Sequence, residues 1–135
     1  MIPVTETDLV EHMVAFAEKF ITQEKAERFA DFARTSKGRQ KWLAKLDHFQ
    51  TTLSPLTRSQ IISRNSAELL RSLPADSNSE VVVFSTLRGL GGARLSLSKA
   101  VELTFKMGNG TVISIELGNL ALYFGEELDE CYLLS

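Results

Sequence analysis

The loop of residues 75–80, with the sequence ADSNSE, separates two segments whose apolar residues follow different patterns. Before the loop, apolar side chains recur every three or four residues, which is typical of helices that bury one face. After it, they gather in short runs bounded by turn residues, which is typical of strands. The sequence therefore predicts an α+β fold, in which about four to five N-terminal helices pack on a C-terminal, mainly antiparallel sheet of about four strands with one inserted helix.

Length and composition fit one domain of this kind. The chain has 135 residues, of which 44% are hydrophobic, and only three prolines. A chain of this length can bury a full hydrophobic core without a disulfide or a structural metal. We therefore expect a single domain over 1–135, with a helical half at 1–74 and a sheet half at 81–135.

Capping residues and apolar stripes predict where the helices of the first half begin. Thr5 with Asp8 can cap a first helix, and Thr22 can start a second that reaches about Arg34. Ser36 is the expected N-cap of a third helix, and Thr57 with Gln60 has capping-box spacing for another. A short helix is expected from Ser66 to Leu73. The expected buried residues of the first and third helices are Leu9, Met13, Phe16 and Phe20, and Trp42, Leu43, Leu46 and Phe49.

Runs of β-branched and aromatic residues predict the strands of the second half. Residues 81–84 are all apolar and suit a strand buried on both faces. Residues 98–107 fit either a strand or a capped helix, and we favour the helix. The segments 111–117 and 120–124, joined by Gly118 and Asn119, predict a hairpin, and the final residues predict a third strand beside it.

Net charge is −2, but the charges are unevenly distributed along the chain. Residues 28–71 contain nine Lys and Arg against three Asp and Glu, whereas both flanking segments are acidic. Lys37, Lys41 and Lys45 recur every four residues along one helical face, beside Arg39, and could bind an anion or an acidic partner. A solvated stripe is the simpler interpretation. Because the total charge is near zero, nucleic-acid binding is an alternative that we do not favour.

The glycine-rich segment RGLGGAR at 88–94 follows the first strand, as in phosphate-binding loops. Gly89 and Gly91 match the start of a GxGxxG pattern, but Arg94 occupies its last position, and no Gly-Lys-Ser/Thr sequence is present. We interpret the segment as a connecting loop between a strand and a helix. Arg88 and Arg94 flank it and could hold an anion between them.

The residue types of metal and catalytic sites are sparse. Two histidines and one cysteine occur without HxxxH or CxxC spacing, so we expect no metal or cofactor and no catalytic residues. The single Cys131 cannot form an internal disulfide, and the first residues lack a signal-peptide pattern. No run approaches the ~18 apolar residues of a membrane span. These features predict a cytoplasmic protein without a membrane partner.

Two segments carry a resemblance to known proteins. The helical segment SKGRQKWLAKLDHF together with GNGTVISIELGNLALYFGEE near the end resembles an uncharacterised family of small bacterial proteins. In that family a Lys-Gly-Arg helix start and a final strand hairpin recur. The resemblance implies an α+β fold and no known activity, and it supplies no site residues.

We therefore expect a small protein-interaction or regulatory module with an unidentified protein partner, more plausibly a binding protein than an enzyme. The alternatives are a nucleic-acid-associated module that uses the basic helical face, and a small-anion-binding protein at the glycine-rich loop. Oligomeric state is left open. The candidate binding residues are Lys37, Arg39, Lys41, Lys45, Arg88 and Arg94.

Overall fold

The computed structural model describes residues 2–86, 90–107, 110–126 and 131–135. Within these residues the chain forms five α-helices, one 3-10 helix and seven strands. In chain order they are β1 (Ile2–Pro3), α1 (Glu6–Phe20), α2 (Gln23–Ala33), α3 (Ser36–Leu43), η1 (Leu46–His48), β2 (Arg58–Gln60), α4 (Ser66–Ser72), β3 (Glu80–Ser85), β4 (Ala93–Ser96), α5 (Leu97–Met107), β5 (Thr111–Glu116), β6 (Leu120–Phe124) and β7 (Cys131–Leu134).

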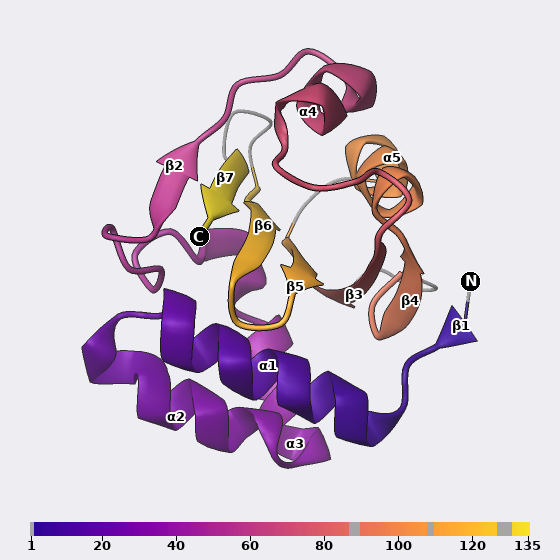
Figure 1. Ribbon diagram of the computed structural model, residues 1–135. Coiled ribbons are helices and arrows are strands. Elements are labelled where there is room, and N and C mark those ends of the chain that lie inside the picture. Colours follow the sequence, from indigo (N-terminus) through magenta and orange to yellow (C-terminus); the bar gives the residue numbers. More distant parts are fainter. Residues whose placement is uncertain (1, 87–89, 108–109, 127–130) are drawn as a thin grey trace.

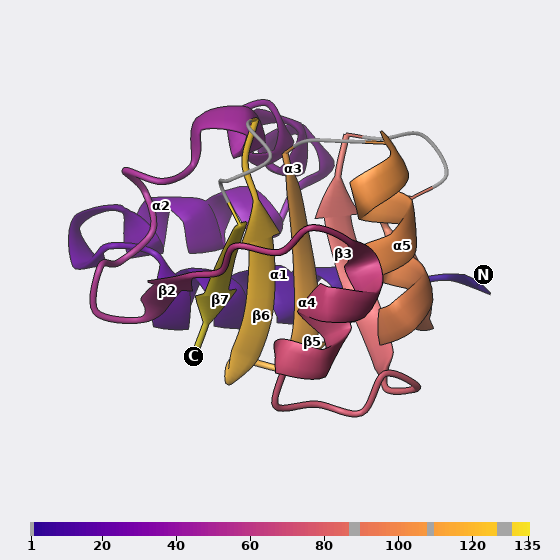
Figure 2. The same ribbon diagram turned by 90° about the horizontal axis from the view of Figure 1, so that it is seen from above.

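A single sheet forms the centre of the fold, with helices on both faces. Its strand order is β1-β4-β3-β5-β6-β7-β2, and every neighbouring pair is antiparallel. Helices α1, α2 and α3 cover one face, and α4 and α5 cover the other (Figure 1). Seen from above, the strands lie side by side between the two helical layers (Figure 2). The α+β prediction is confirmed, although the arrangement has three layers.

The sheet has more strands among the described residues than the predicted four. Strands β1 and β2 come from the first half of the chain, which we expected to be helical, and β4 begins within the glycine-rich segment, at Ala93. Strands β1 and β2 contain two and three residues. Such short segments carry no readable periodicity, so only their pairing with a neighbouring strand determines their conformation.

Side-chain caps begin α1, α3 and α4, whereas Thr22 precedes α2 without a side-chain cap hydrogen bond. The Asp8 N–H donates to the Thr5 hydroxyl at 3.1 Å, which confirms the predicted start of α1. The N-cap of α3 is Thr35, whose hydroxyl accepts from the Gly38 N–H at 2.9 Å, and not Ser36 as predicted. Thr and Ser are both good N-cap residues. Thr35 is the cap because its backbone is extended, as an N-cap requires, whereas Ser36 already lies within the helix.

Helix α3 ends earlier than its apolar stripe predicts. It stops at Leu43, and Leu46 lies in η1 while Phe49 follows it. The Tyr123 hydroxyl, on β6, donates to the Leu46 carbonyl and accepts from the Phe49 N–H at 3.0 Å. A side chain from the sheet thus supplies partners for backbone groups that a longer helix would have paired internally.

The helix expected from the Thr57 and Gln60 spacing is absent. These residues lie in and beside β2, where Arg58 pairs with Leu134 of β7. A capping pattern is short and frequent, and here the otherwise open edge of β7 provides stronger backbone pairing. The following short helix is confirmed as α4, capped by Asn65.

The predictions for the second half mostly hold. Residues 98–107 are helical in α5, and β5, β6 and β7 form the expected consecutive hairpins. Gly118 in the β5–β6 turn has a φ of 70°, which favours glycine. The glycine-rich segment leads into strand β4 and not directly into a helix. The prediction that it connects a strand to a helix, in the order seen in phosphate-binding loops, is therefore wrong. Residues 87–89 of that segment lie outside the described residues.

Each face of the sheet carries its own core. On the side of α1, α2 and α3, Trp42 packs with ring-centroid distances of 5.2 Å to Phe29 and 6.3 Å to Phe84. On the α4 and α5 side the core is aliphatic and includes Val81 and Val83. Strand β3 contributes to both cores, which confirms that it is buried on both faces.

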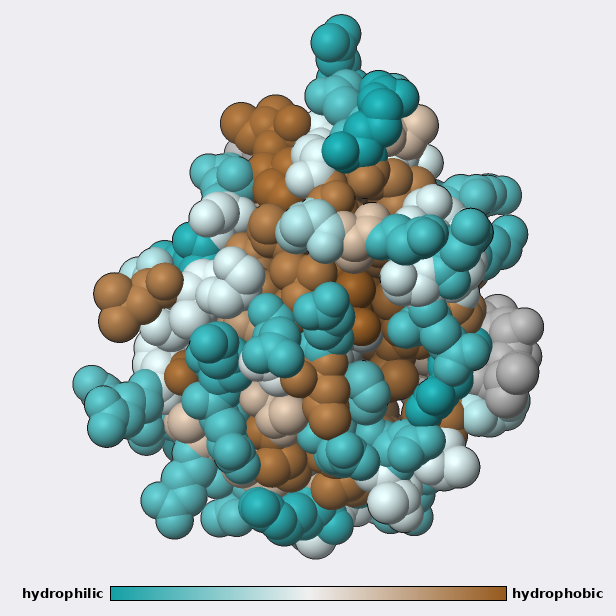
Figure 3. Space-filling model, viewed as in Figure 1, coloured by the Kyte–Doolittle hydropathy of each residue, from teal (hydrophilic) through white to brown (hydrophobic). Residues whose placement is uncertain are grey.

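A few large apolar side chains are exposed among the described residues. They are Leu56, Ile62 and Leu117, exposed by 93%, 78% and 40%. Figure 3 shows apolar side chains projecting at the side of the molecule where β2 and its flanking segments lie. Among the described residues, none of the helices combines the length and apolar character needed to cross a membrane.

Candidate ligand-binding pocket

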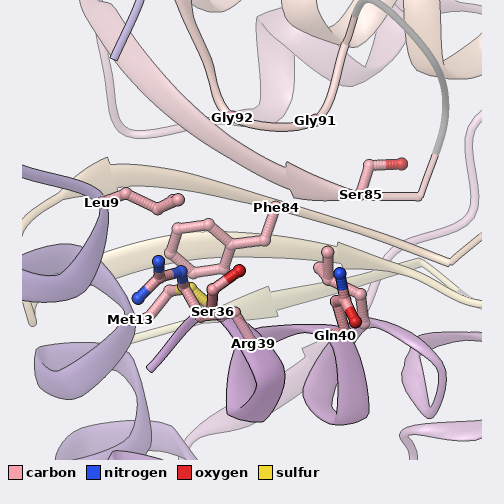
Figure 4. Close-up of a pocket in the computed structure, with 10 residues that line it drawn as sticks. Leu9, Met13, Ser36, Arg39, Gln40, Phe84, Ser85, Gly91 and Gly92 are labelled. Atoms are coloured by element: carbon pink, nitrogen blue, oxygen red, sulfur yellow. The ribbon is translucent and has the colours of Figure 1, made fainter. Parts of the chain in front are cut away.

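A pocket of about 240 Å³ opens between α1, α3 and the end of β3. Figure 4 shows the backbone of the β3–β4 connection at Gly91 and Gly92 on one side and the α3 side chains on the other. The pocket therefore brings together the two segments that the sequence marked as candidates, the basic helix and the glycine-rich loop. Its location depends on packing of three elements that are far apart in the sequence.

The inner wall of the pocket is apolar. It is formed by Leu9 and Met13 of α1, Leu43 of α3 and Phe84 of β3. Met13 and Phe84 are each only 1% exposed, so this wall is continuous with the aromatic core. An apolar part of a ligand would lose contact with water here, which is the usual driving force for small-molecule binding.

Among the described residues that line the pocket, Arg39 is the charged one, and two contacts hold it in place. Its Nη1 donates to the Ala33 carbonyl and its Nη2 to Glu6 Oε1, both at 2.8 Å. The Arg39 side chain is only 12% exposed, whereas that of Glu6 is 73% exposed. Because a guanidinium has five N–H donors, these two contacts orient Arg39 without using all of its capacity.

Three more polar side chains among the described residues line the pocket. Ser36 and Gln40 lie with Arg39 on α3, and Ser85 lies at the end of β3 (Figure 4). Ser85 Oγ is 2.9 Å from Thr111 Oγ1 of β5, which holds the Ser85 side chain toward the sheet. Ser36 stands in the first turn of α3, where the helix dipole favours negative charge.

The two glycines allow the β3–β4 connection to lie close to the end of β3. A Cβ on Gly91 would stand 1.9 Å from the Ser85 carbonyl oxygen, so a larger residue cannot fit without moving the backbone. Gly92 has a φ of 73°, donates its N–H to Val83 at 2.8 Å and accepts from Val4 at 3.1 Å. These glycines serve close backbone approach at the pocket wall.

The structure separates the other predicted cations from this pocket. Lys37 is exposed, and Lys41 and Lys45 line a different, shallow groove between α2 and α3. Arg94 on β4 forms ion pairs with Asp8 at 2.7 Å and Glu80 at 2.9 Å, so its charge is already matched. Arg88, the second cation proposed to flank the loop, lies outside the described residues.

A polar contact that the sequence did not suggest joins α1 to the sheet. His12 Nδ1 lies 2.8 Å from Ser114 Oγ of β5, although 102 positions separate the two residues. Burial, and then the charge of Arg94, lowers the pKa of His12 below its ordinary value of 6.5. Ser114 is only 3% exposed, and neither residue lines the pocket. The pair therefore anchors the helix to the sheet.

The remaining titratable candidates do not form a site with the pocket. Burial raises the pKa of Cys131 to about 12, which makes its thiol unreactive. His48 and Glu126 lie 3.4 Å apart, and both are exposed. In the part of the chain that the structure describes, we found no group of three His, Cys, Asp or Glu residues that could hold a metal ion.

Sequence reasoning identified Arg39 but missed most of the pocket. Met13 and Phe84 carry the same pattern as any core residue, and Ser36 was interpreted only as a helix cap. Gln40 carried no signal. None of these residues could have been grouped before the packing of α1 and α3 against β3 was known.

Comparisons with protein-family models, with curated proteins and with solved structures found no match for this chain. This outcome is consistent with the resemblance to a family without known activity, and it transfers no functional residue from another protein. The function must therefore be inferred from the pocket and the surface of the chain itself.

Proposed function

We propose that the protein binds a small amphipathic anion, such as a carboxylate with a short alkyl or aromatic part, in the pocket between α1, α3 and β3. The observation that carries this proposal is the oriented Arg39 guanidinium at a cavity whose inner wall is formed by core residues. A charged head and an apolar body would each meet matching surface.

The size of the cavity supports a small ligand. An apolar cavity of about 150 Å³ can hold a benzene ring. The pocket measures about 240 Å³, which leaves room for a ring or short chain and a carboxylate. Drug-sized ligands generally occupy roughly 300 Å³ or more. The pocket thus suits a metabolite-sized acid.

Glu6 gives this site a specific property. Its carboxylate occupies one guanidinium nitrogen of Arg39 at 2.8 Å and is largely exposed. An incoming carboxylate competes with it for the same donor. Glu6→Gln should therefore strengthen binding of an acid, because it removes the competing charge and leaves the lining of the pocket unchanged.

The proposal is tested by titrating benzoate, with benzamide as the neutral probe, and following backbone amide shifts by NMR. We expect benzoate to shift residues of α1, α3 and the β3–β4 connection, and Arg39→Gln to weaken its binding roughly 10- to 100-fold. Lys37→Gln is the matched control, because this neighbouring cation does not line the pocket. Equal binding of both probes, or equal effects of both variants, would contradict the proposal.

A second candidate function rests on the groove between α2 and α3. Arg28, Lys41 and Lys45 line it around Phe32, and the cationic groups of Arg28 and Lys41 lie 5.8 and 5.9 Å from the Phe32 ring centroid. Among the residues that the structure describes, no acidic side chain lines this groove. An acidic segment of a protein partner would fit it, as in the interaction module expected from the sequence.

Binding of an acidic peptide can be separated from nucleic-acid binding by direct titration of each. We expect a glutamate-rich peptide carrying one tryptophan to bind more tightly than a single-stranded oligonucleotide. The paired variant Lys41→Gln/Lys45→Gln should weaken the peptide complex, whereas Lys99→Gln on α5 should not. Tighter binding of the oligonucleotide would favour the nucleic-acid alternative.

We also propose that the protein is cytoplasmic and that its chain forms one domain. The single cysteine, buried in β7, supports a reducing and hence cytoplasmic environment. The two cores share the strands of one sheet, which supports a single cooperative domain over 1–135. A single unfolding transition, seen alike by fluorescence and circular dichroism, is the expected result.

A further inference from the structure

Two strongly exposed apolar residues flank one edge of the sheet. Leu56 lies in the turn that precedes β2, and Ile62 follows β2 by two residues. They are exposed by 93% and 78%. Strand β2 is the last strand in the sheet order, so these side chains stand beside a terminal strand. A sheet edge with exposed apolar side chains is a common site at which another chain adds a strand to the sheet.

The pairing of β2 with β7 determines which backbone groups face outward. Thr57 accepts from the Ser135 N–H at 2.9 Å, and Ile61 donates to the Cys131 carbonyl at 2.8 Å. These odd-numbered positions direct their backbone groups toward β7. Alternate positions of an antiparallel strand face opposite sides, so the N–H and C=O of Arg58 are directed to the outer edge.

The charge on β2 does not protect this edge. Sheet edges are commonly guarded by charged side chains that project outward. Arg58 is the charged residue of β2, but its guanidinium lies 5.4 Å from the centroid of the Tyr132 ring. It also donates to the Gln50 carbonyl. The charge is therefore directed back onto the protein's own sheet.

We propose that a second copy of this chain pairs with β2 in an antiparallel arrangement about a two-fold axis at Ser59. Leu56 and Ile62 are each three positions from Ser59. A two-fold axis at Ser59 therefore brings the turn that carries Leu56 beside Ile62 of the partner subunit, and this contact occurs twice.

The same register contains no conflict of charge. Arg58 stands opposite Gln60 of the partner subunit, and Thr57 opposite Ile61 of the partner subunit. The net charge of −2 is too small to oppose association strongly. With a three-residue strand and four apolar side chains the interface is small, which fits a weak dimer that dissociates on dilution.

Sedimentation equilibrium of the full chain over a wide concentration range tests the proposal. We expect the mass to rise from one chain to two. Leu56→Glu or Ile62→Lys alone should weaken the dimer at least tenfold. The double variant Leu56→Glu/Ile62→Lys should recover association, because each introduced carboxylate faces an introduced ammonium. Leu117→Glu, at the third exposed apolar residue, is the control and should leave the dimer unchanged.

A cysteine substitution tests the register directly. In Ser59→Cys the two thiols face each other at a non-hydrogen-bonded pair, with Cα atoms about 4.5 Å apart, which a disulfide can span. In Gln60→Cys the Cα atoms are about 8 Å apart, which is too far. We expect rapid oxidation to a cross-linked dimer only for Ser59→Cys. A chain that stays monomeric at all concentrations, or that cross-links equally at both positions, would overturn the proposal.

Discussion

Replacing Tyr123 by Phe should destabilise the protein far more than the loss of one oxygen atom suggests. Tyr123 is fully buried on β6, and its hydroxyl donates to the Leu46 carbonyl and accepts from the Phe49 N–H. Leu46 and Phe49 are themselves buried. The Tyr123→Phe variant keeps the ring but leaves two main-chain groups without this partner, far from water.

The expected cost follows from these two groups. A buried donor or acceptor that loses its partner costs about 1–3 kcal/mol. Part of this is offset because the hydroxyl itself no longer has to be desolvated. We therefore expect the free energy of unfolding to fall by about 2–4 kcal/mol. With a urea dependence of about 2 kcal/mol per molar, the midpoint should move down by roughly 1–2 M.

Urea unfolding followed by the fluorescence of Trp42, the single tryptophan, measures this change. Tyr132→Phe is the matched control. Tyr132 stacks on Tyr123 with ring centroids 6.3 Å apart, but its hydroxyl makes no hydrogen bond to the described residues. We expect that variant to change stability by less than about 0.5 kcal/mol. Similar losses in both variants would refute the reasoning.

Three further outcomes can be checked on the same protein. Burial raises the pKa of Cys131 to about 12, so the thiol of the native protein should react with a disulfide reagent only as fast as the structure around it unfolds. The thiol of the unfolded protein should react at once. Immediate labelling of Cys131 in the native protein would contradict this. Gly38→Ala should lower the free energy of unfolding by about 1–3 kcal/mol, because the added Cβ would stand 2.3 Å from the Phe32 carbonyl oxygen. This loss is expected although alanine is the better helix former. A raised melting temperature would show that the contact can relax. The lowered pKa of His12, caused by burial and then by Arg94, means that the unfolded chain binds more protons. The contribution of His12 is therefore complete above about pH 6.5 and is lost as the pH falls below it. The stability difference between wild type and His12→Gln should become less favourable to the wild type from pH 7.5 to pH 5.5 in urea titrations, and a constant difference would argue against the assignment.

The candidate site was only partly accessible from the sequence. Arg39 belonged to a basic helical stripe, but nothing in that stripe distinguished it from Lys37, Lys41 and Lys45. The contacts to Ala33 and Glu6 turn Arg39 toward the pocket, and they exist only because α3 folds back beside the N-terminal part of α1. Its neighbours on the helix remain at the surface or in the shallow groove.

The sequence by itself determined the local conformations that depend on near neighbours. Apolar spacing and caps predicted α1, α2, α4 and α5, and short runs of β-branched, aromatic and other apolar residues predicted β3, β5, β6 and β7. Tertiary structure alone decided the strands β1, β2 and β4, the early end of α3 and the three-layer arrangement. The physical reason is that periodicity reports which side of an element is buried but not what buries it. Two- and three-residue strands, the Tyr123 contacts and the pocket all depend on partners more than thirty positions away, which only the folded chain brings together.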